Sequence, residues 1–287
     1  MLNSRIVATT GALILFTITA IAIQIRNVSE KNKKSDYNLK AERSSTTPAD
    51  IISDSKSTDD SNLFTPLPVP GPHDWLANHY ESGQTFKEYL FAEKNDLSNK
   101  RNTIYILPMW RFDKDKSPDL ELLKEYTERY FSVPVKLLPP VSPKKNHFSQ
   151  RVNSHTGKEQ LHAGEILNYL LKKLPNDGYC ILGITMVDLY PDQSWNYVFG
   201  YASYKQRVGV FSFARFDRSF FNEKDSTDHK LLFLRSCKVL SHETGHMFGL
   251  AHCIAFHCNM NGSNNLDESD AQPLHLCPLC LKKLQYT

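Results

Sequence analysis

One short stretch near the carboxy-terminal end of this 287-residue chain holds residues that are well suited to bind a metal ion. His242 and His246 are four residues apart, so on an α-helix their imidazoles lie on the same face and can bind one ion. Gly249 can adopt a positive φ, which ends a helix and reverses the chain. His252 would then return toward the same ion. The spacing therefore predicts a zinc site with three histidine ligands.

The predicted site has the composition of a catalytic zinc centre. Three protein ligands leave a fourth coordination position for water, whereas a structural zinc is closed by four protein ligands. Glu243 directly follows His242 and would lie beside the ion, where its carboxylate could accept a proton from zinc-bound water. This chemistry suits the hydrolysis of peptide bonds by Glu243-assisted attack of that water, but the spacing does not specify a substrate. In the alternative interpretation the histidines are ordinary polar groups and only the cysteines described next bind metal.

Four of the six cysteines follow this stretch and form a second candidate metal site. Cys253 and Cys258 form a Cys-x4-Cys pair, and Cys277 and Cys280 form a Cys-x-x-Cys pair. This count and clustering are typical of a closed, structural zinc site with four thiolate ligands. Because His252 and Cys253 are consecutive, their side chains diverge and could serve two different ions. Two disulfide bonds are the alternative in an exported protein, since such bonds persist in oxidising compartments.

Four other residues that could bind metal are expected to have ordinary roles. His257 and His275 lie within the cysteine-rich region and could replace a ligand, but we expect them to be solvated or hydrogen-bonded. Cys180 and Cys237 lie in apolar runs, which favours inert buried thiols. The sequence therefore predicts two zinc ions per chain, one at three histidines and one at four cysteines.

The predicted secondary structure places the histidine motif on a long helix backed by a sheet. Short runs rich in β-branched and aromatic residues predict strands, and apolar residues at helical spacing predict helices. Alternation of the two in the first half of the folded region indicates an α/β (α+β) domain with a mixed, twisted sheet. The expected strands are 103–107, 133–138, 179–184, 196–201 and 208–214, and the expected helices follow Ser117 and span 159–174 and 230–248.

Residues 6–25 carry no charge and are mostly apolar. An α-helix needs roughly 20 apolar residues to cross the hydrocarbon core of a bilayer, so we expect a membrane anchor helix here. The alternatives are a cleaved signal peptide, with Ala20 and Ala22 as the small residues of its cleavage site, and a soluble buried helix. More positive charge follows this segment than precedes it. The positive-inside tendency therefore predicts a single-pass membrane protein whose catalytic domain faces the cytosol.

Composition divides the chain into three regions. The anchor segment spans 1–26, a polar tether that ends in a proline-rich stretch spans 27–72, and the folded domain spans 73–287. The tether contains too few large apolar side chains to offset the entropy of ordering it, so disorder is expected. The net charge of +3 is too close to zero to indicate nucleic acid as a partner.

The complete set of candidate ligands resembles the archaemetzincins, zinc metallopeptidases of the metzincin clan, and their eukaryotic members in particular. The resemblance covers 73–287 and rests on His-Glu-x-x-His-x-x-Gly-x-x-His-Cys-x4-Cys-x-Met followed by Cys-x-x-Cys. It implies a compact metzincin-like domain with a carboxy-terminal zinc subdomain that contains the four cysteines. It further implies that Glu243 is the general base and that Met260 packs beneath the zinc-binding histidines. The strand 208–214 would be the edge strand above the cleft, where a substrate could add by β-pairing.

These interpretations together predict a zinc-dependent metallopeptidase that acts on a peptide or protein substrate. The alternative is a zinc-stabilised binding or scaffold protein with little or no peptidase activity. The presence of Glu243 argues against this alternative, because a scaffold has no use for that carboxylate.

Overall fold

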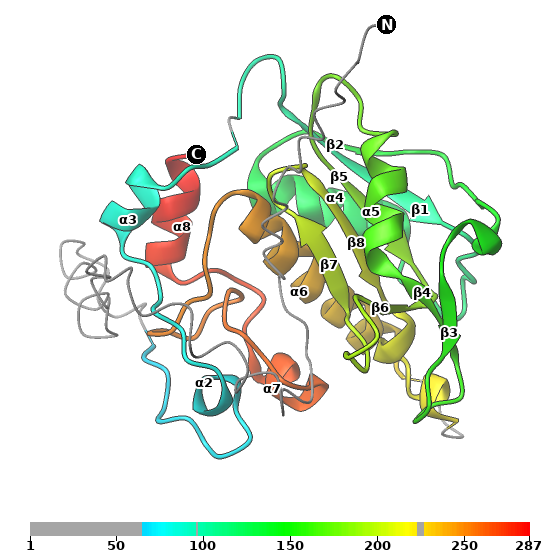
Figure 1. The fold of residues 1–287 in the computed structure, drawn as a ribbon. Helices are drawn as coiled ribbons and strands as arrows, with labels where there is room; N and C mark the ends of the chain where they lie inside the picture. The colour runs from blue at the N-terminus through cyan, green and yellow to red at the C-terminus, as the bar shows by residue number, and fades with distance from the viewer. Residues whose placement is uncertain (1–64, 96, 223–226) are drawn as a thin grey trace, which may run out of the picture.

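The structure, a computed structural model, describes residues 65–95, 97–222 and 227–287. A five-stranded sheet with helices on both faces lies beside a smaller lobe, which is formed by the two ends of the described chain (Figure 1). The predicted fold class is confirmed: the chain is an α/β (α+β) domain with a mixed, twisted sheet and a long helix that carries the histidine motif.

The main sheet has the strand order β2-β1-β5-β8-β7, with four parallel strands and β7 antiparallel at one edge. Every residue of β1, β5 and β8 is buried, as expected for strands that are covered on both faces. A second sheet of three strands has the order β3-β4-β6. The strands are β1 (Thr103–Met109), β2 (Val135–Leu137), β3 (Gln150–Val152), β4 (Glu159–His162), β5 (Gly178–Thr185), β6 (Asp188–Tyr190), β7 (Gly200–Ser203) and β8 (Val208–Ser212).

Helices cover both faces of the main sheet. Helices α4 (Leu120–Phe131) and α6 (His229–Met247) pack on one face, and α5 (Ala163–Leu171) packs on the other (Figure 1). One apolar core lies between the sheet and α6, and a second lies between the sheet and α5. The helix that carries the histidine motif is therefore fixed against the sheet along its length.

The smaller lobe joins segments from opposite ends of the chain. Helix α3 (Phe86–Phe91) packs against α8 (Pro278–Gln285), and Tyr89 of α3 belongs to the apolar cluster that contains the four cysteines. The main chain before α2 (Trp75–Asn78) is also bonded to the cysteine loop: Leu67 N donates to Ala255 O at 2.9 Å. The remaining helices are α7 (Leu266–Ala271) and short 3₁₀ turns at Lys145–His147, Ala214–Phe216 and Arg218–Phe221.

Two predicted elements differ from those observed. Residues 159–162, predicted as the start of a helix, form β4, because Leu161 pairs with Leu189 of β6 and this tertiary pairing overrides helical propensity. The predicted strand 103–107 continues through Pro108. Proline has no main-chain N–H. At position 108 that group would point toward β2, but β2 pairs with β1 only as far as Leu137, so no sheet hydrogen bond is lost.

The position of the predicted edge strand is wrong. Strand β8, which matches the predicted 208–214, lies between β5 and β7 and is hydrogen-bonded on both sides. The edge position belongs to β7 (Gly200–Ser203), which within the described residues pairs only with β8. The predicted strand 196–201 thus begins later than expected and occupies the edge of the sheet.

The predicted membrane attachment is wrong. In the described ranges, no helix is both long enough and apolar enough to cross a membrane. Helix α6 is the longest of them, but Lys230, Arg235, Lys238 and Glu243 interrupt it with charge. The anchor predicted at 6–25 lies outside the described residues. The membrane as a partner, the single-pass localisation and the cytosol-facing orientation are therefore withdrawn, and the domain limits stay a prediction.

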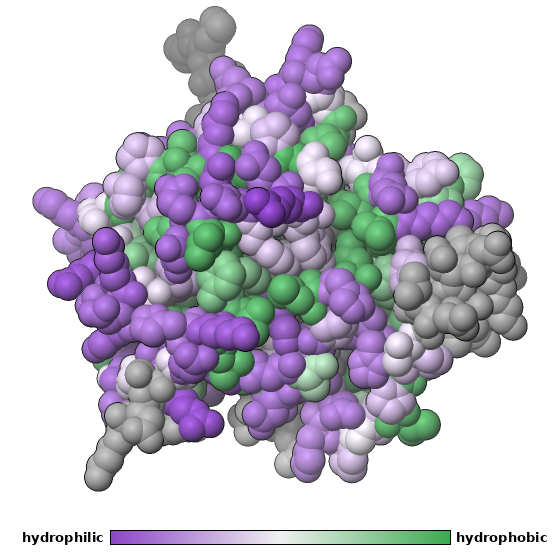
Figure 2. Space-filling model, turned by 180° about the vertical axis from the view of Figure 1, so that it is seen from behind, coloured by the Kyte–Doolittle hydropathy of each residue, from purple (hydrophilic) through white to green (hydrophobic). Residues whose placement is uncertain are grey.

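The exposed apolar side chains come from many different elements. On the face seen from behind, hydrophobic side chains lie in separate groups among polar ones (Figure 2). Scattered exposure of this kind is ordinary for a globular protein and does not indicate a docking face. The large apolar side chains that are exposed in the described chain are those of Val69, Tyr80, Leu90, Phe91, Leu122, Val152, Leu171, Phe221, Leu281 and Tyr286.

Candidate functional site

Helix α6 ends in a reversal that returns the chain toward the two histidines on its last turns. Gly249 has a φ of 84°, as predicted. Leu250 N donates to Gly245 O at 3.2 Å, and Gly249 N donates to His246 O at 2.9 Å, which is the Schellman pattern of hydrogen bonds. The Tyr179 hydroxyl and the Asn95 side-chain amide both donate to the Met247 carbonyl, at 2.8 and 3.4 Å. The end of the helix is thus fixed by its own main chain and by the sheet.

This reversal brings the three predicted histidines together. One ring nitrogen from each of His242, His246 and His252 lies within 4.8 Å of the others. The Nε2 atoms of His242 and His246 are 3.1 Å apart. Two nitrogens bound to one tetrahedral zinc at about 2.0–2.1 Å would be about 3.3 Å apart. The geometry therefore fits a single zinc ion.

Each of these histidines uses its other ring nitrogen, Nδ1, to donate a hydrogen bond. Because a carbonyl or carboxylate oxygen can only accept, each Nδ1 carries the proton and each neutral ring keeps a lone pair on Nε2. Those lone pairs face one another, and His252 Nε2 has no partner among the described residues. A cation bound between the three rings would accept all three Nε2 lone pairs. The acceptors are Asn259 O for His242 at 2.7 Å, Leu250 O for His246 at 2.6 Å and Glu81 Oε1 for His252 at 2.6 Å.

Burial keeps two of the imidazoles uncharged in the metal-free protein. It lowers the pKa of His242 to about 3, with a further contribution from the neighbouring His252. Burial likewise lowers the pKa of His246 well below its usual value. Near neutral pH both rings are therefore ready to bind a metal without first losing a proton.

Glu243 follows His242 on α6 and contacts the edge strand β7. Its side chain is buried, and Oε2 has no hydrogen-bond partner in the described chain. A Cβ atom at Gly200, the first residue of β7, would lie 3.4 Å from Glu243 Cδ, so the carboxyl group contacts this strand. Burial raises the pKa of Glu243 well above its usual value. A raised pKa is typical of a carboxyl group that holds and transfers a proton in catalysis.

The four carboxy-terminal cysteines form a separate buried cluster. Their sulfur atoms all lie within 4.8 Å of one another, and Cys253 Sγ is 3.9 Å from Cys277 Sγ. This distance is close to the roughly 3.8 Å between sulfurs in a tetrahedral site with zinc–sulfur bonds of about 2.3 Å. It is far longer than a disulfide bond of about 2.0 Å, and all four thiols are free. The arrangement thus fits the predicted closed zinc site rather than two disulfides.

The remaining predicted residues lie outside both clusters. Cys180 and Cys237 are fully buried, and burial raises the pKa of each thiol to about 12, which makes them unreactive. His275 is exposed, and neither it nor His257 belongs to a metal-binding group of the described chain. Met260 is fully buried beneath the histidine helix, where a Cβ added to Gly245 would lie 2.7 Å from its sulfur.

Sequence reasoning missed the partners that orient the histidines. Two are main-chain carbonyls, of Asn259 and Leu250, which no residue type can reveal. The side chain of Asn259 also donates to Ser241 Oγ at 2.8 Å, so the loop that holds His242 is tied to the same helix. The third, Glu81, lies 171 residues away in sequence from His252. No local pattern marks it.

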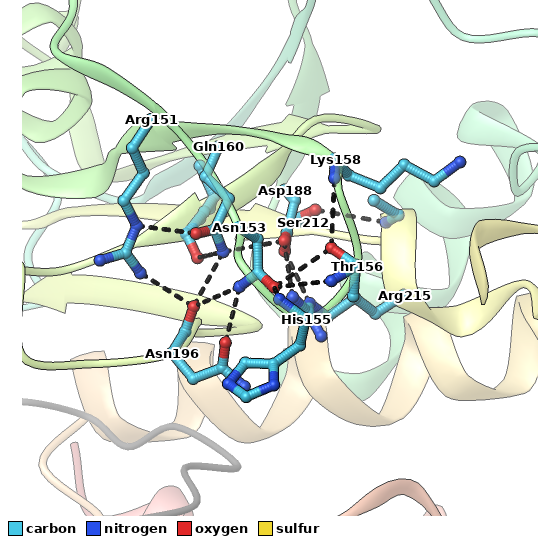
Figure 3. Close-up of polar contacts among 12 residues, drawn as sticks. Arg151, Asn153, His155, Thr156, Lys158, Gln160, Asp188, Asn196, Ser212 and Arg215 are labelled. Atoms are coloured by element: carbon cyan, nitrogen blue, oxygen red, sulfur yellow. Dashed lines mark hydrogen bonds and ion pairs between the residues drawn. The ribbon is translucent and has the colours of Figure 1, made fainter.

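A buried polar network supports the loop that leads into the edge strand (Figure 3). Arg215 donates two hydrogen bonds to Asp188, at 2.8 and 2.7 Å, and Gln160 Nε2 donates to the same carboxylate at 2.8 Å. Gln160 Nε2 and Arg151 also donate to the carbonyl of Asn196, at 3.0 and 2.9 Å. The network therefore fixes the main chain just before β7, the strand that contacts Glu243.

Comparison with known proteins agrees with this geometry. The sequence profile of peptidase family M54 matches residues 159–286. Archaemetzincin-2 of Homo sapiens is 42% identical over 254 residues, in an alignment that covers 78% of this chain and 70% of that protein. The chain belongs to the archaemetzincin family. The predicted resemblance, enzyme class and cofactor are thereby confirmed: this archaemetzincin is a zinc-dependent metallopeptidase.

Two solved structures are similar to this archaemetzincin over most of their own length. A zinc-dependent peptidase from Methanocorpusculum labreanum is 25% identical with a TM-score of 0.52, and the alignment covers 63% of this chain and 99% of that one. An archaemetzincin from Methanopyrus kandleri is 28% identical with a TM-score of 0.50, covering 65% and 95% of the two chains. The fold described above is thus the fold of the family.

Proposed function

We propose that this archaemetzincin hydrolyses peptide bonds at a zinc ion held by His242, His246 and His252, with Glu243 as the general base. The observation that carries the proposal is the convergence of three Nε2 lone pairs beside a buried carboxyl group. A second zinc ion, held by Cys253, Cys258, Cys277 and Cys280, would be structural, because four thiolates leave no position for water.

The chain's own groups supply positioning and proton transfer. A bound zinc ion acts as a Lewis acid, which acidifies a water ligand and polarises the scissile carbonyl group. The Glu243 carboxylate accepts the proton of the attacking water and later delivers it to the leaving amine. Within the described residues β7 pairs with β8 alone, and its outer edge is where the main chain of an extended peptide would pair, beside Glu243.

Peptide-library cleavage tests the proposed activity. Protein with both metal sites filled should cleave members of the library, lose this activity when a chelator removes the histidine-bound zinc, and regain it when zinc is added back. A fully zinc-loaded protein that leaves a broad library intact would contradict the proposal and favour the scaffold alternative.

Zinc binding at the histidine site should release protons, and Glu243 should supply part of that release. Burial raises the pKa of Glu243 well above its usual value in the metal-free protein, and a nearby cation lowers that pKa, so zinc binding favours the loss of a proton from this carboxyl group. His242 and His246 contribute none, because their lowered pKa values leave them neutral. The number of protons released is measured by calorimetric titration in buffers of different ionisation enthalpy. The cysteine site is filled with zinc beforehand. Glu243→Gln should release fewer protons than wild type, and equal release from both proteins would contradict this role.

A further inference from the structure

Three hydrogen bonds orient the candidate zinc ligands, and only one of them comes from a side chain. His242 and His246 donate to main-chain carbonyls that lie within the carboxy-terminal part of the chain. His252 instead donates to the carboxylate of Glu81 at 2.6 Å. Glu81 belongs to residues 73–85, which we call the strap. This acceptor can therefore be removed by a single substitution, whereas the two carbonyl acceptors cannot.

Glu81 contacts the side of the imidazole that faces away from the other histidines. Nδ1 and Nε2 lie on opposite sides of the ring, so a carboxylate bonded to Nδ1 cannot reach the ion that Nε2 would bind. The contact instead fixes the tautomer and the orientation of the ring and makes Nε2 a better donor to a metal. The side chain of His252 is only 9% exposed and that of Glu81 only 21%, so water competes little for this hydrogen bond.

The strap holds Glu81 in place through Trp75. The Trp75 indole N–H donates to Glu81 Oε1 at 2.8 Å, and the Trp75 ring lies edge-on to His252 with a centroid separation of 5.6 Å. Trp75 is buried, and its main-chain N–H donates to Glu268 Oε1 of α7 at 2.8 Å. The carboxylate is thus attached to the lobe that also contains the cysteine cluster.

A second side chain of the strap fixes the loop that carries His252. Gln84 Nε2 donates to Gly249 O at 3.2 Å, and Gln84 Oε1 accepts from Ala251 N at 3.3 Å. These two contacts flank Leu250, whose carbonyl accepts the hydrogen bond from His246. The strap therefore supports both the third histidine and the acceptor of the second.

We propose that Glu81 is a positioning residue that completes the histidine zinc site from the amino-terminal strap. The inference rests on the proposed assignment of His252 as a zinc ligand. Glu81 lies well before residues 159–286, the part of the chain that the peptidase family profile matches. High-affinity zinc binding therefore requires a segment outside that region.

Cobalt substitution tests this role without relying on activity. Cobalt at the cysteine site gives intense thiolate charge-transfer bands together with its own d–d bands, whereas cobalt at the histidine site adds only weak d–d bands. The histidine site is therefore followed in the full chain as the d–d absorbance gained after the charge-transfer bands have saturated. Glu81→Ala should weaken metal binding at the histidine site by roughly 10–100-fold and leave the charge-transfer bands unchanged. Glu81→Gln keeps an oxygen acceptor but loses the charge, so its affinity should fall by less and its d–d bands should shift.

The controls separate this inference from the proposed function. Glu125→Ala, which removes an exposed carboxylate on α4, should change neither site. Wild-type protein that gains no d–d absorbance after its charge-transfer bands saturate would contradict the proposed function, whereas filled histidine sites of equal affinity in wild type and Glu81→Ala would overturn only the role of Glu81. If Glu81→Ala also loses the charge-transfer bands, the variant has lost its fold, and the test then rests on Glu81→Gln. Unchanged cobalt affinity and unchanged d–d bands in Glu81→Gln would overturn the inference.

Discussion

Replacing Glu243 with glutamine is expected to lower kcat/KM for a cleaved peptide by roughly 100- to 10,000-fold, the range that general acid–base catalysis contributes. Glutamine has nearly the same shape as the glutamic acid, so it fits the buried position next to β7. It cannot accept a proton from the attacking water, and it carries none to the leaving amine. The loss should therefore appear mainly in kcat, since no contact with the metal is removed.

Two measurements make the Glu243→Gln result interpretable. The zinc content of the variant should equal that of wild type, and so should its midpoint in urea. A variant that keeps both zinc ions and its stability, yet cleaves peptides within about tenfold of the wild-type rate, would exclude Glu243 as the general base.

Replacing Arg215 with methionine is expected to lower the free energy of unfolding by about 3–5 kcal/mol. The Asp188 side chain is 1% exposed and that of Arg215 is 5% exposed, and the two form a pair of hydrogen bonds. Methionine has a similar length but leaves the carboxylate of Asp188 as a buried charge without its partner. The guanidinium group also stacks on Tyr197, with a separation of 3.6 Å, so packing before β7 is weakened as well. Urea unfolding measures the difference.

An exposed ion pair provides the matched control. Arg111 and Asp113 are 3.4 Å apart, but the Arg111 side chain is 86% exposed, so Arg111→Met should cost at most about 1 kcal/mol. Combining Arg215→Met with Asp188→Asn should recover part of the lost stability, because the second substitution removes the unpaired charge. If Arg215→Met lowers the free energy of unfolding no more than Arg111→Met does, the buried pair of Arg215 and Asp188 does not stabilise the protein as predicted.

The residues of both candidate metal sites were predictable because their spacing is local. Helical periodicity alone brings His242 and His246 onto one face, and a glycine after them allows the chain to return with His252. The cysteines could be grouped from their number and pairing, although the sequence left disulfides open. The structure brings both predicted groups together, each within 4.8 Å.

What could not be predicted depends on contacts between distant parts of the chain. Residues 159–162 form a strand because a neighbouring strand, β6, lies beside them. The order of strands, which gives the edge position to β7, is likewise a property of the whole sheet. Glu81 meets His252 only after the chain has folded, and nothing near either residue marks the contact. The membrane-anchor prediction at 6–25 rests on apolar length and lack of charge, not on any contact within the fold.

The position of zinc in crystals of the full-length protein, measured by anomalous scattering at the zinc absorption edge, would show directly whether the histidines hold a metal ion. Two peaks are expected. One should lie about 2.0–2.1 Å from the Nε2 atoms of His242, His246 and His252, and the other about 2.3 Å from the four cysteine sulfurs. A peak at the cysteines alone, from protein saturated with zinc, would contradict the assignment of the histidines as the catalytic site.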